Sequence, residues 1–504
     1  MKARSLSAAT FAVAAVIGCA EIRPDARVGE AIDLVGDHTG HRPGWTAPWD
    51  EKPPPWDGTT VLGPDEAVVM ALRNNRQLRA DLEMIGHANA DLVQAGLLQN
   101  PMISFMIMFP DGGGRSMLRG TAPLMPLQDL WLIPAREAVA AARLREAVLR
   151  VADRAVETAA AVRKTYARLQ YTQRAAELIR DNMAVVDQSI RIIHARQAAG
   201  RATQVEVNLS QIRHMRLRSE LLAIQAEHRG LQRQLLELMG VAFATDQWTV
   251  RPVHEVRDPL DAPIAEADLL ELAGQQRLDL KAAEWSTLAA GRNIRLVRRE
   301  GWPDLALGFT FERAPAPRSQ NPGLAGQAAN AAVQGVSNAI MGMPPTPPMA
   351  APFSPKMREV TYTMGPMLEM EIPIFDYNQA QAAKAVHEFR QRVAEYEARF
   401  QEIARMVRET LVMYAQAHEQ VRFYRDSILP AAERNVALAR QSYVAGREEL
   451  TVYLQAQEDL LMTRLKLLEF YRDCLVNRAE LERQVGGRLV RPGPATRPAG
   501  VSTR

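Results

Sequence analysis

The longest regular pattern in the sequence lies between Pro134 and Gly240, and it constrains the fold more than any other feature. Apolar residues recur along its first arm in steps of three and four, an average of about 3.5 that is typical of a left-handed coiled coil. The pattern turns back at 198–201, around Gly200. A helix over 135–199 would be roughly 98 Å long, which no compact domain can bury. The sequence therefore predicts an elongated helical hairpin.

The same design returns in the second half of the chain. Corresponding residues lie 202 positions apart before residues 313–358, and 246 or 247 positions apart after them. The jump matches the length of that segment, so the chain is predicted to be a duplicated unit with one long insertion. The pairs are Leu78 and Leu280, Pro101 and Pro303, Pro126 and Pro373, Gly200 and Gly446, and Gly240 and Gly486.

Each half is expected to contain a helix, two strands and a helical hairpin. In the first half these are a helix over 66–99 broken near Asn75, strands over 102–109 and 116–127, and the hairpin over 134–240. In the second half they are a helix over 265–300, strands over 303–312 and 360–371, and a hairpin over 378–486 bent at Pro430. The predicted domains are a signal peptide (1–18), a leader (19–64), the first repeat (65–240), a linker (241–264), the second repeat (265–487, with a loop at 313–358) and a disordered tail (488–504).

The N-terminus is predicted to be a lipoprotein signal. Lys2 and Arg4 precede a short apolar stretch that ends in Gly18 and Cys19, as in bacterial lipoprotein signals in which the cysteine is lipidated. The leader that follows has no periodicity and is expected to be irregular. Its tryptophans, Trp45, Trp49 and Trp56, are expected to pack against the body or the lipid interface.

The predicted strands alternate between large apolar and small or polar residues. Ile103, Phe105, Ile107 and Phe109 point one way in the first strand, and Leu305, Leu307, Phe309 and Phe311 do so in the third. Outer-membrane barrels show this alternation, but they need about eight strands or more, and open edges are not tolerated in hydrocarbon. Four strands per chain therefore predict that several chains share one barrel.

Several short segments resemble those of the TolC-like outer-membrane efflux proteins, over about residues 65–487, with the lipid signal typical of their lipoprotein branch. The segments are 71–75 (ALRNN), 97–101 (LLQNP), 365–366 (GP), 372–376 (IPIFD) and 442–446 (SYVAG). The resemblance implies a mostly α-helical homotrimer: a 12-stranded barrel in the outer membrane of a Gram-negative bacterium, four strands from each chain, joined to a periplasmic α-barrel of long coiled-coil hairpins. Such proteins work with a periplasmic adaptor and an inner-membrane pump, here expected to be of the resistance-nodulation-division type.

The resemblance also implies a gate where the hairpins turn, at Gly200 and Gly446. In the family, a network of tyrosine, acidic residue and arginine closes this mouth. Tyr443 matches the family tyrosine and Glu206 falls near the family acidic position, while Arg447 and Glu448 depart from the usual order. Val452 and Gln455 stand where some members carry an acidic ring. Glu448, Glu449 and Asp459 either replace that ring or are solvated helix charges.

The function implied is a passive exit duct, with a type I protein-secretion duct or a copper- or silver-type efflux duct as alternatives. The net charge of +3 gives no reason to expect nucleic acid. No nucleophile elbow, phosphate loop, CxxC or HExxH motif is present, so neither an enzyme, a cofactor nor a metal site is predicted. The methionines of the strands and the long loop suit Cu(I), or else serve as adaptable apolar filler; they are Met102, Met106, Met108, Met117, Met341, Met343, Met349, Met357, Met364, Met367 and Met370.

Overall fold

The structure is a computed structural model of the chain. It describes residues 27–45, 56, 61–100, 102–109, 116–241, 248–252, 265–315, 334, 338, 341 and 360–489. The chain divides into two compact units, and both draw on both halves of the repeat. A helical unit comprises Met1–Ala95, Glu137–Ile294 and Lys384–Arg504, and a strand unit comprises Gly96–Arg136 and Arg295–Ala383. Cys19, most of the long loop and the tail from residue 490 lie outside the described residues.

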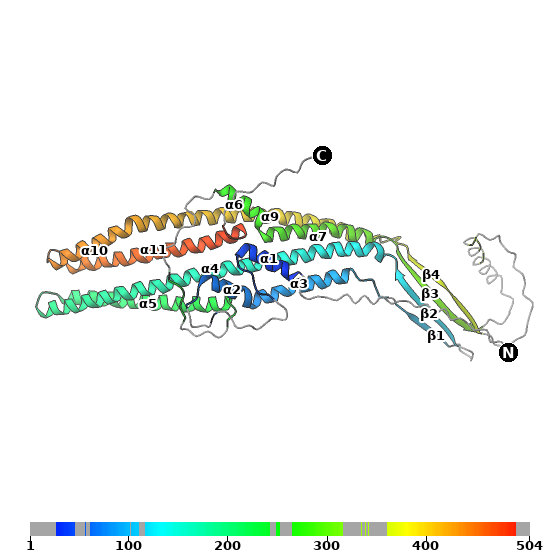
Figure 1. The fold of residues 1–504 in the computed structure, drawn as a ribbon, viewed down its shortest axis with the longest axis horizontal. Coiled ribbons are helices and arrows are strands. Elements are labelled where there is room, and N and C mark those ends of the chain that lie inside the picture. The colour runs from blue at the N-terminus through cyan, green and yellow to red at the C-terminus, as the bar shows by residue number, and fades with distance from the viewer. Residues whose placement is uncertain are drawn as a thin grey trace, which may run out of the picture. The chain divides into compact units, whose positions relative to one another are not determined.

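The first half contains the predicted hairpin, formed by α4 (Asp129–Ala198) and α5 (Gln204–Leu238), which lie side by side in Figure 1. Helix α4 begins five residues before Pro134, which we expected to start it. Pro134 lies in the second turn, where a proline removes only one helical hydrogen bond. The predicted break near Asn75 is confirmed, because it separates α2 (Pro64–Asn74) from α3 (Arg76–Ala95).

The second half repeats this arrangement. Its first helix is not continuous as predicted, because Arg277 separates α6 (Glu266–Gln276) from α7 (Leu278–Glu300). The long arm consists of α9 (Gln379–Phe423), a π-helical turn η1 (Tyr424–Ile428) and α10 (Leu429–Val444), and α11 (Leu450–Val485) returns beside it. The π turn stands directly before Pro430, whose missing N–H interrupts the regular hydrogen-bond ladder there.

All four hairpin arms end in the same way. Gly200, Gly240, Gly446 and Gly486 have positive φ values of 69°, 66°, 68° and 91°. In each case the next residue donates its N–H to the carbonyl five residues earlier, as Arg201 does to Arg196 and Val241 does to Leu236. This is the Schellman motif, in which glycine takes the left-handed position at no steric cost. The spacing of these glycines in the sequence therefore records four equivalent helix ends.

The helix breaks at Asn75 and Arg277 are also equivalent, and each receives the end of a hairpin arm. Their backbones match, with φ and ψ of −56° and 121° at Asn75 and −59° and 121° at Arg277. The Asn75 side-chain amide donates to the Leu238 carbonyl (2.9 Å), and the Arg277 guanidinium donates to the Gln484 carbonyl (3.3 Å). In each half two short helices thus meet end to end: α3 meets α5 in the first half, and α7 meets α11 in the second. In each half, two short helices placed end to end therefore run beside the long arm (Figure 1).

The leader is more ordered than predicted. Residues Val28–Thr39 form helix α1, whose Ala31 and Val35 are fully buried against the helical unit. Their spacing of four places both on one face of a helix. Our prediction of an irregular leader was wrong here, because three helical turns are too short to give a clear periodic signal. The Trp45 indole donates to the Leu72 carbonyl, and Trp56 packs edge-on against Trp248, so these two tryptophans do pack against the body; Trp49 lies outside the described residues.

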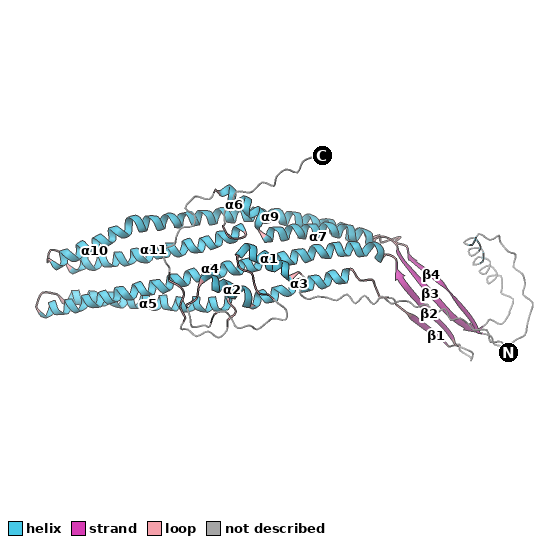
Figure 2. Ribbon diagram, in the orientation of Figure 1, coloured by secondary structure: helices cyan, strands magenta, loops and turns pink. Residues whose placement is uncertain are grey.

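The strand unit contains a four-stranded antiparallel sheet in the order β1-β2-β3-β4, drawn in magenta in Figure 2. The strands are β1 (Ser104–Met108), β2 (Met117–Pro126), β3 (Asp304–Pro315) and β4 (Val360–Glu371). Strands β2 and β3 come from different halves of the chain and pair directly. All four strands were predicted, and each boundary agrees to within a few residues.

Candidate functional site: a two-faced sheet and a helical tip

One face of the sheet is apolar and exposed. The register pairs Phe311 with Met364 and Leu307 with Leu368, and directly opposed residues of antiparallel strands share a face. Phe105 of β1 is 74% exposed and Leu368 of β4 is 64% exposed. A water-soluble domain rarely presents so many large apolar side chains together. The large apolar side chains of this face, which also carries Arg313 between Leu118 and Tyr362, are Phe105, Ile107, Leu118, Leu305, Leu307, Phe309, Phe311, Tyr362, Met364, Leu368 and Met370.

The opposite face is polar. The Ser104 and Thr121 hydroxyls form a hydrogen bond across β1 and β2, and the Arg119 guanidinium lies 3.5 Å from the Glu312 carboxylate across β2 and β3. At the other end of the sheet, Asp304 stands opposite Glu371. The sheet thus separates an apolar surface from a hydrated one, as the alternation in the sequence predicted.

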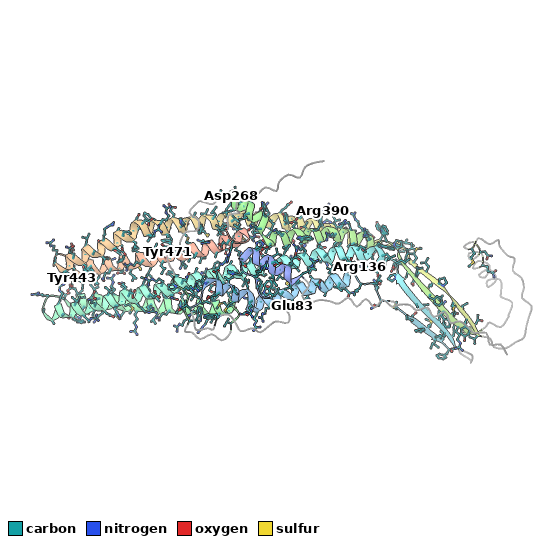
Figure 3. All side chains as sticks on the ribbon, viewed as in Figure 1. Glu83, Arg136, Asp268, Arg390, Tyr443 and Tyr471 are labelled. Atoms are coloured by element: carbon teal, nitrogen blue, oxygen red, sulfur yellow. The ribbon has the colours of Figure 1, made fainter. Side chains whose placement is uncertain are left out.

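Within the helical unit, the two hairpin turns around Gly200 and Gly446 pack together to form what we call the tip. Its apolar core is made by four buried side chains from α4, α5 and α11: Ile193, Val207, Leu450 and Leu454. Tyr443, labelled near the end of α10 in Figure 3, lies beside this core. Further along the hairpins the Arg213 guanidinium contacts the Glu458 carboxylate at 2.6 Å.

A contact among one arginine and two tyrosines joins the two hairpins at the tip. The rings of Tyr443 and Tyr453 stack with centroids 6.0 Å apart and an interplanar angle of 6°. The Arg196 guanidinium carbon lies 4.8 Å from the centroid of the Tyr443 ring. A cation–π contact of this kind contributes about 0.5–2 kcal/mol. Sequence reasoning named Tyr443 but missed Arg196 and Tyr453, because no local pattern links Arg196 to residues almost 250 positions away.

The other residues predicted for the gate have different surroundings. The Glu206 carboxylate accepts hydrogen bonds from the Thr203 backbone N–H (2.6 Å) and hydroxyl (3.1 Å), so it caps α5. Gly200 and Gly446 form the turns themselves. Arg447 and Glu448 are exposed, and among the described residues their side chains form neither ion pair nor hydrogen bond. Within one chain the structure therefore does not bring Glu206 together with Tyr443.

A dense charge network surrounds the break at Arg277. The Arg277 guanidinium donates to both Asp279 carboxylate oxygens (2.8 and 2.7 Å) and to the Gln484 side-chain oxygen (2.6 Å). Burial opposes ionisation of Asp279, but hydrogen bonds from Arg277 and Arg399 hold its pKa below the usual value. Asp153 on α4 is in the opposite situation: burial, reinforced by the charge of Asp279, raises its pKa to about 6. The ionised Asp153 therefore weakens the helical unit.

The pKa of Asp153 predicts a pH-dependent stability. Since the folded state holds this proton more tightly than the unfolded chain, the free energy of unfolding should fall as pH rises from about 4 to about 6. At neutral pH the ionised Asp153 lowers the free energy of unfolding by roughly 3 kcal/mol. We expect Asp153→Asn to raise the thermal unfolding midpoint, followed by circular dichroism, at neutral pH and to change it little near pH 4. Asp181→Asn, on an exposed part of the same helix, is the control; an equal gain there would contradict this explanation.

The described part of the chain contains no group of three or more His, Cys, Asp and Glu side chains arranged to hold a metal ion. The His214 imidazole lies 3.2 Å from the Asp187 carboxylate. Cys474 is buried beside Tyr414 and Ala417. None of the helices in the described ranges combines the length and the apolarity needed to cross a bilayer.

Comparisons with known proteins agree with this geometry. A family model described as outer membrane efflux protein matches residues 269–487. Among solved structures, a membrane protein from Pseudomonas aeruginosa has a TM-score of 0.64 at 20% identity, covering 84% of this chain and 93% of that one. The outer membrane protein VceC from Vibrio cholerae has a TM-score of 0.62 at 14% identity, covering 84% of this chain and 96% of that one. The channel protein CusC has a TM-score of 0.63 at 17% identity, covering 88% of this chain and 99% of that one.

No curated protein matches the sequence. At these identities the solved structures establish the fold, and the family match adds the sequence relationship of the second half. Residues 269–487 therefore resemble the outer membrane efflux protein family, and the chain has the fold of these solved structures.

Proposed function

We propose that this chain forms, as a homotrimer, the exit duct of a tripartite efflux system. In this proposal a periplasmic adaptor and an inner-membrane pump of the resistance-nodulation-division type deliver the substrate. The duct itself conducts passively from the periplasm through the outer membrane and performs no catalysis. The pump supplies the energy, and the protein opens and closes the path.

The two-faced sheet is the observation that carries this proposal. Its apolar face is exposed, and its edge strands β1 and β4 each have a single neighbour in the described sheet. Hydrocarbon tolerates strands only when every edge is paired, because unpaired backbone groups are costly there. Three copies joined edge to edge would make a closed barrel of about 12 strands, within the range of membrane barrels. The apolar face would then meet lipid, and the polar face would line water.

In this proposal the tip closes the duct. Arg196 of α4 and Tyr443 of α10 belong to different hairpins, so their contact holds the two hairpins together within each chain. Opening by separation of the hairpins requires this contact to break. We propose Arg196, Tyr443 and Tyr453 as the closing contact, with Gly200 and Gly446 as the turns. Glu206 supports one hairpin as a helix cap, and Arg447 and Glu448 are exposed to contact neighbouring chains or the adaptor.

We further propose that Cys19 is lipidated, with palmitate among its acyl chains, and anchors the leader to the outer membrane. This prediction is carried by the sequence, since Cys19 lies outside the described residues. Incorporation of labelled palmitate measures it.

The proposed duct is tested by the conductance of the purified full chain in planar bilayers. We expect stepwise conductance from the wild-type protein, and larger steps from Arg196→Ala because the cation–π contact with Tyr443 is lost. Arg191→Ala removes the same charge from an exposed position on the same helix and is the matched control. Absence of steps in every variant would overturn the duct. Equal steps from the two arginine variants would exclude the Arg196 contact from the closure.

A further inference from the structure

Three methionines gather on the polar face of the β1–β2 hairpin. The register places Met108 directly opposite Met117, and Met106 lies two residues before Met108 on the same face. Directly opposed residues have Cβ atoms about 4.5–5.5 Å apart, and diagonal neighbours such as Met106 and Met117 are about 7–8 Å apart. The methionine side chain has three rotatable bonds, so all three thioether sulfurs can converge on one point.

Burial does not explain these methionines. Met106 is 56% exposed and Met108 is 43% exposed. They lie on the face of Ser104, Thr121 and Glu312, opposite the face that carries Phe105 and Ile107. On that apolar face a methionine would serve as filler, as Met364 and Met370 do beside Phe311 and Leu305. On the polar face, large apolar side chains exposed to water gain nothing from the hydrophobic effect.

The charges around the three methionines favour a cation of low charge. Arg119 stands opposite Met106, but its guanidinium lies 3.5 Å from the Glu312 carboxylate. This pairing offsets the positive charge that would otherwise repel a metal ion. Thioethers are soft, neutral ligands that select Cu(I) and related monovalent ions over Zn²⁺ or Mg²⁺.

We propose that Met106, Met108 and Met117 form a binding site for one soft monovalent metal ion, Cu(I) or Ag(I), in each chain. The ion would be held by the three thioether sulfurs alone. The location of the site in a water-filled lumen rests on the proposed function, but the site itself rests on the register of β1 and β2. A metal passing through the duct would meet this site near the β1–β2 turn.

Silver binding by the full-length protein in detergent tests the proposal. Ag(I) is the probe because it needs no reductant, and isothermal titration in chloride-free buffer measures its affinity and stoichiometry. We expect the triple variant Met106→Leu, Met108→Leu, Met117→Leu to bind about one Ag(I) fewer per chain, or to bind it at least about tenfold more weakly. Leucine conserves the side-chain volume, so the sheet is expected to remain intact.

The matched control is Met364→Leu with Met370→Leu, which changes methionines on the apolar face of the same sheet. Cys474 is present in every variant, so its contribution cancels in the comparison. X-ray absorption of the silver-bound wild type should show sulfur as the nearest neighbour. Binding should also be unchanged between about pH 5.5 and pH 7.5, because thioethers do not titrate whereas histidine does. Equal silver binding by the triple variant and the control, or none by the wild type, would overturn the site.

The outcomes separate the site from the duct. If silver binding depends on the three methionines but the protein forms no channel, the metal site is supported and its location in a channel lumen is wrong. If the protein forms a channel but silver binding does not depend on the three methionines, the duct is supported and the metal site is wrong.

Discussion

Gly240→Ala is expected to destabilise the helical unit far more than Gly200→Ala, although both glycines end a hairpin arm with nearly the same backbone. Their φ values are 66° and 69°, so alanine at either position carries the cost of the left-handed conformation, about 1–2 kcal/mol. At Gly240 a Cβ atom would also lie 2.2 Å from the Asn74 carbonyl oxygen, whereas at Gly200 nothing lies within 4 Å. Relieving that overlap requires a backbone shift and adds about 1–3 kcal/mol.

Denaturant unfolding followed by circular dichroism measures the loss of stability in the Gly240→Ala and Gly200→Ala variants. The second half provides an independent pair, since a Cβ at Gly486 would lie 2.9 Å from the Arg277 nitrogen and one at Gly446 would meet nothing within 4 Å. We expect Gly486→Ala to lose more stability than Gly446→Ala. If all four variants lost the same amount, the left-handed backbone alone would explain the glycines and the close approach to the helix breaks would not matter.

Arg277→Ala is expected to lower the free energy of unfolding by about 3–5 kcal/mol, the range for removing one partner of a buried ion pair. The Arg277 side chain is only 4% exposed, and its loss leaves the Gln484 oxygens without a donor and removes two hydrogen bonds from Asp279. Arg399→Ala is the control. This arginine also contacts Asp279, but it is 36% exposed, so its loss should cost about 1 kcal/mol.

Arg277→Asn tests the equivalence of the two helix breaks. Asn75 both donates to the Leu238 carbonyl and accepts from the Leu78 N–H. In the second half these roles are divided, because Arg277 donates to Gln484 and Asp279 accepts from the Leu280 N–H. Asparagine at 277 should therefore recover part of the stability that alanine loses. If Arg277→Asn were no more stable than Arg277→Ala, the two helix breaks would be stabilised by different interactions.

The candidate site divides into parts that the sequence could and could not predict. The two faces of the sheet follow from the alternation of residues such as Phe309 and Thr310, because successive side chains of a strand point to opposite faces. The aromatic contact at the tip could not be predicted fully. Tyr443 was identified by its motif, but Arg196 and Tyr453 reach it only through packing between the hairpins. The capping role of Glu206 was readable in Thr203-Gln204-Val205-Glu206, a capping box.

The sequence by itself determined the features that depend on neighbours along the chain. These are the coiled-coil arms, the four strands, the duplication and the glycine turns, since periodicity and left-handed backbone requirements are local. The tertiary structure decided the break at Arg277, where a good helix former takes an extended conformation because its guanidinium is bound by Asp279 and Gln484. It also decided that 28–39 is a helix, because burial of Ala31 and Val35 supplies the free energy that three isolated turns lack.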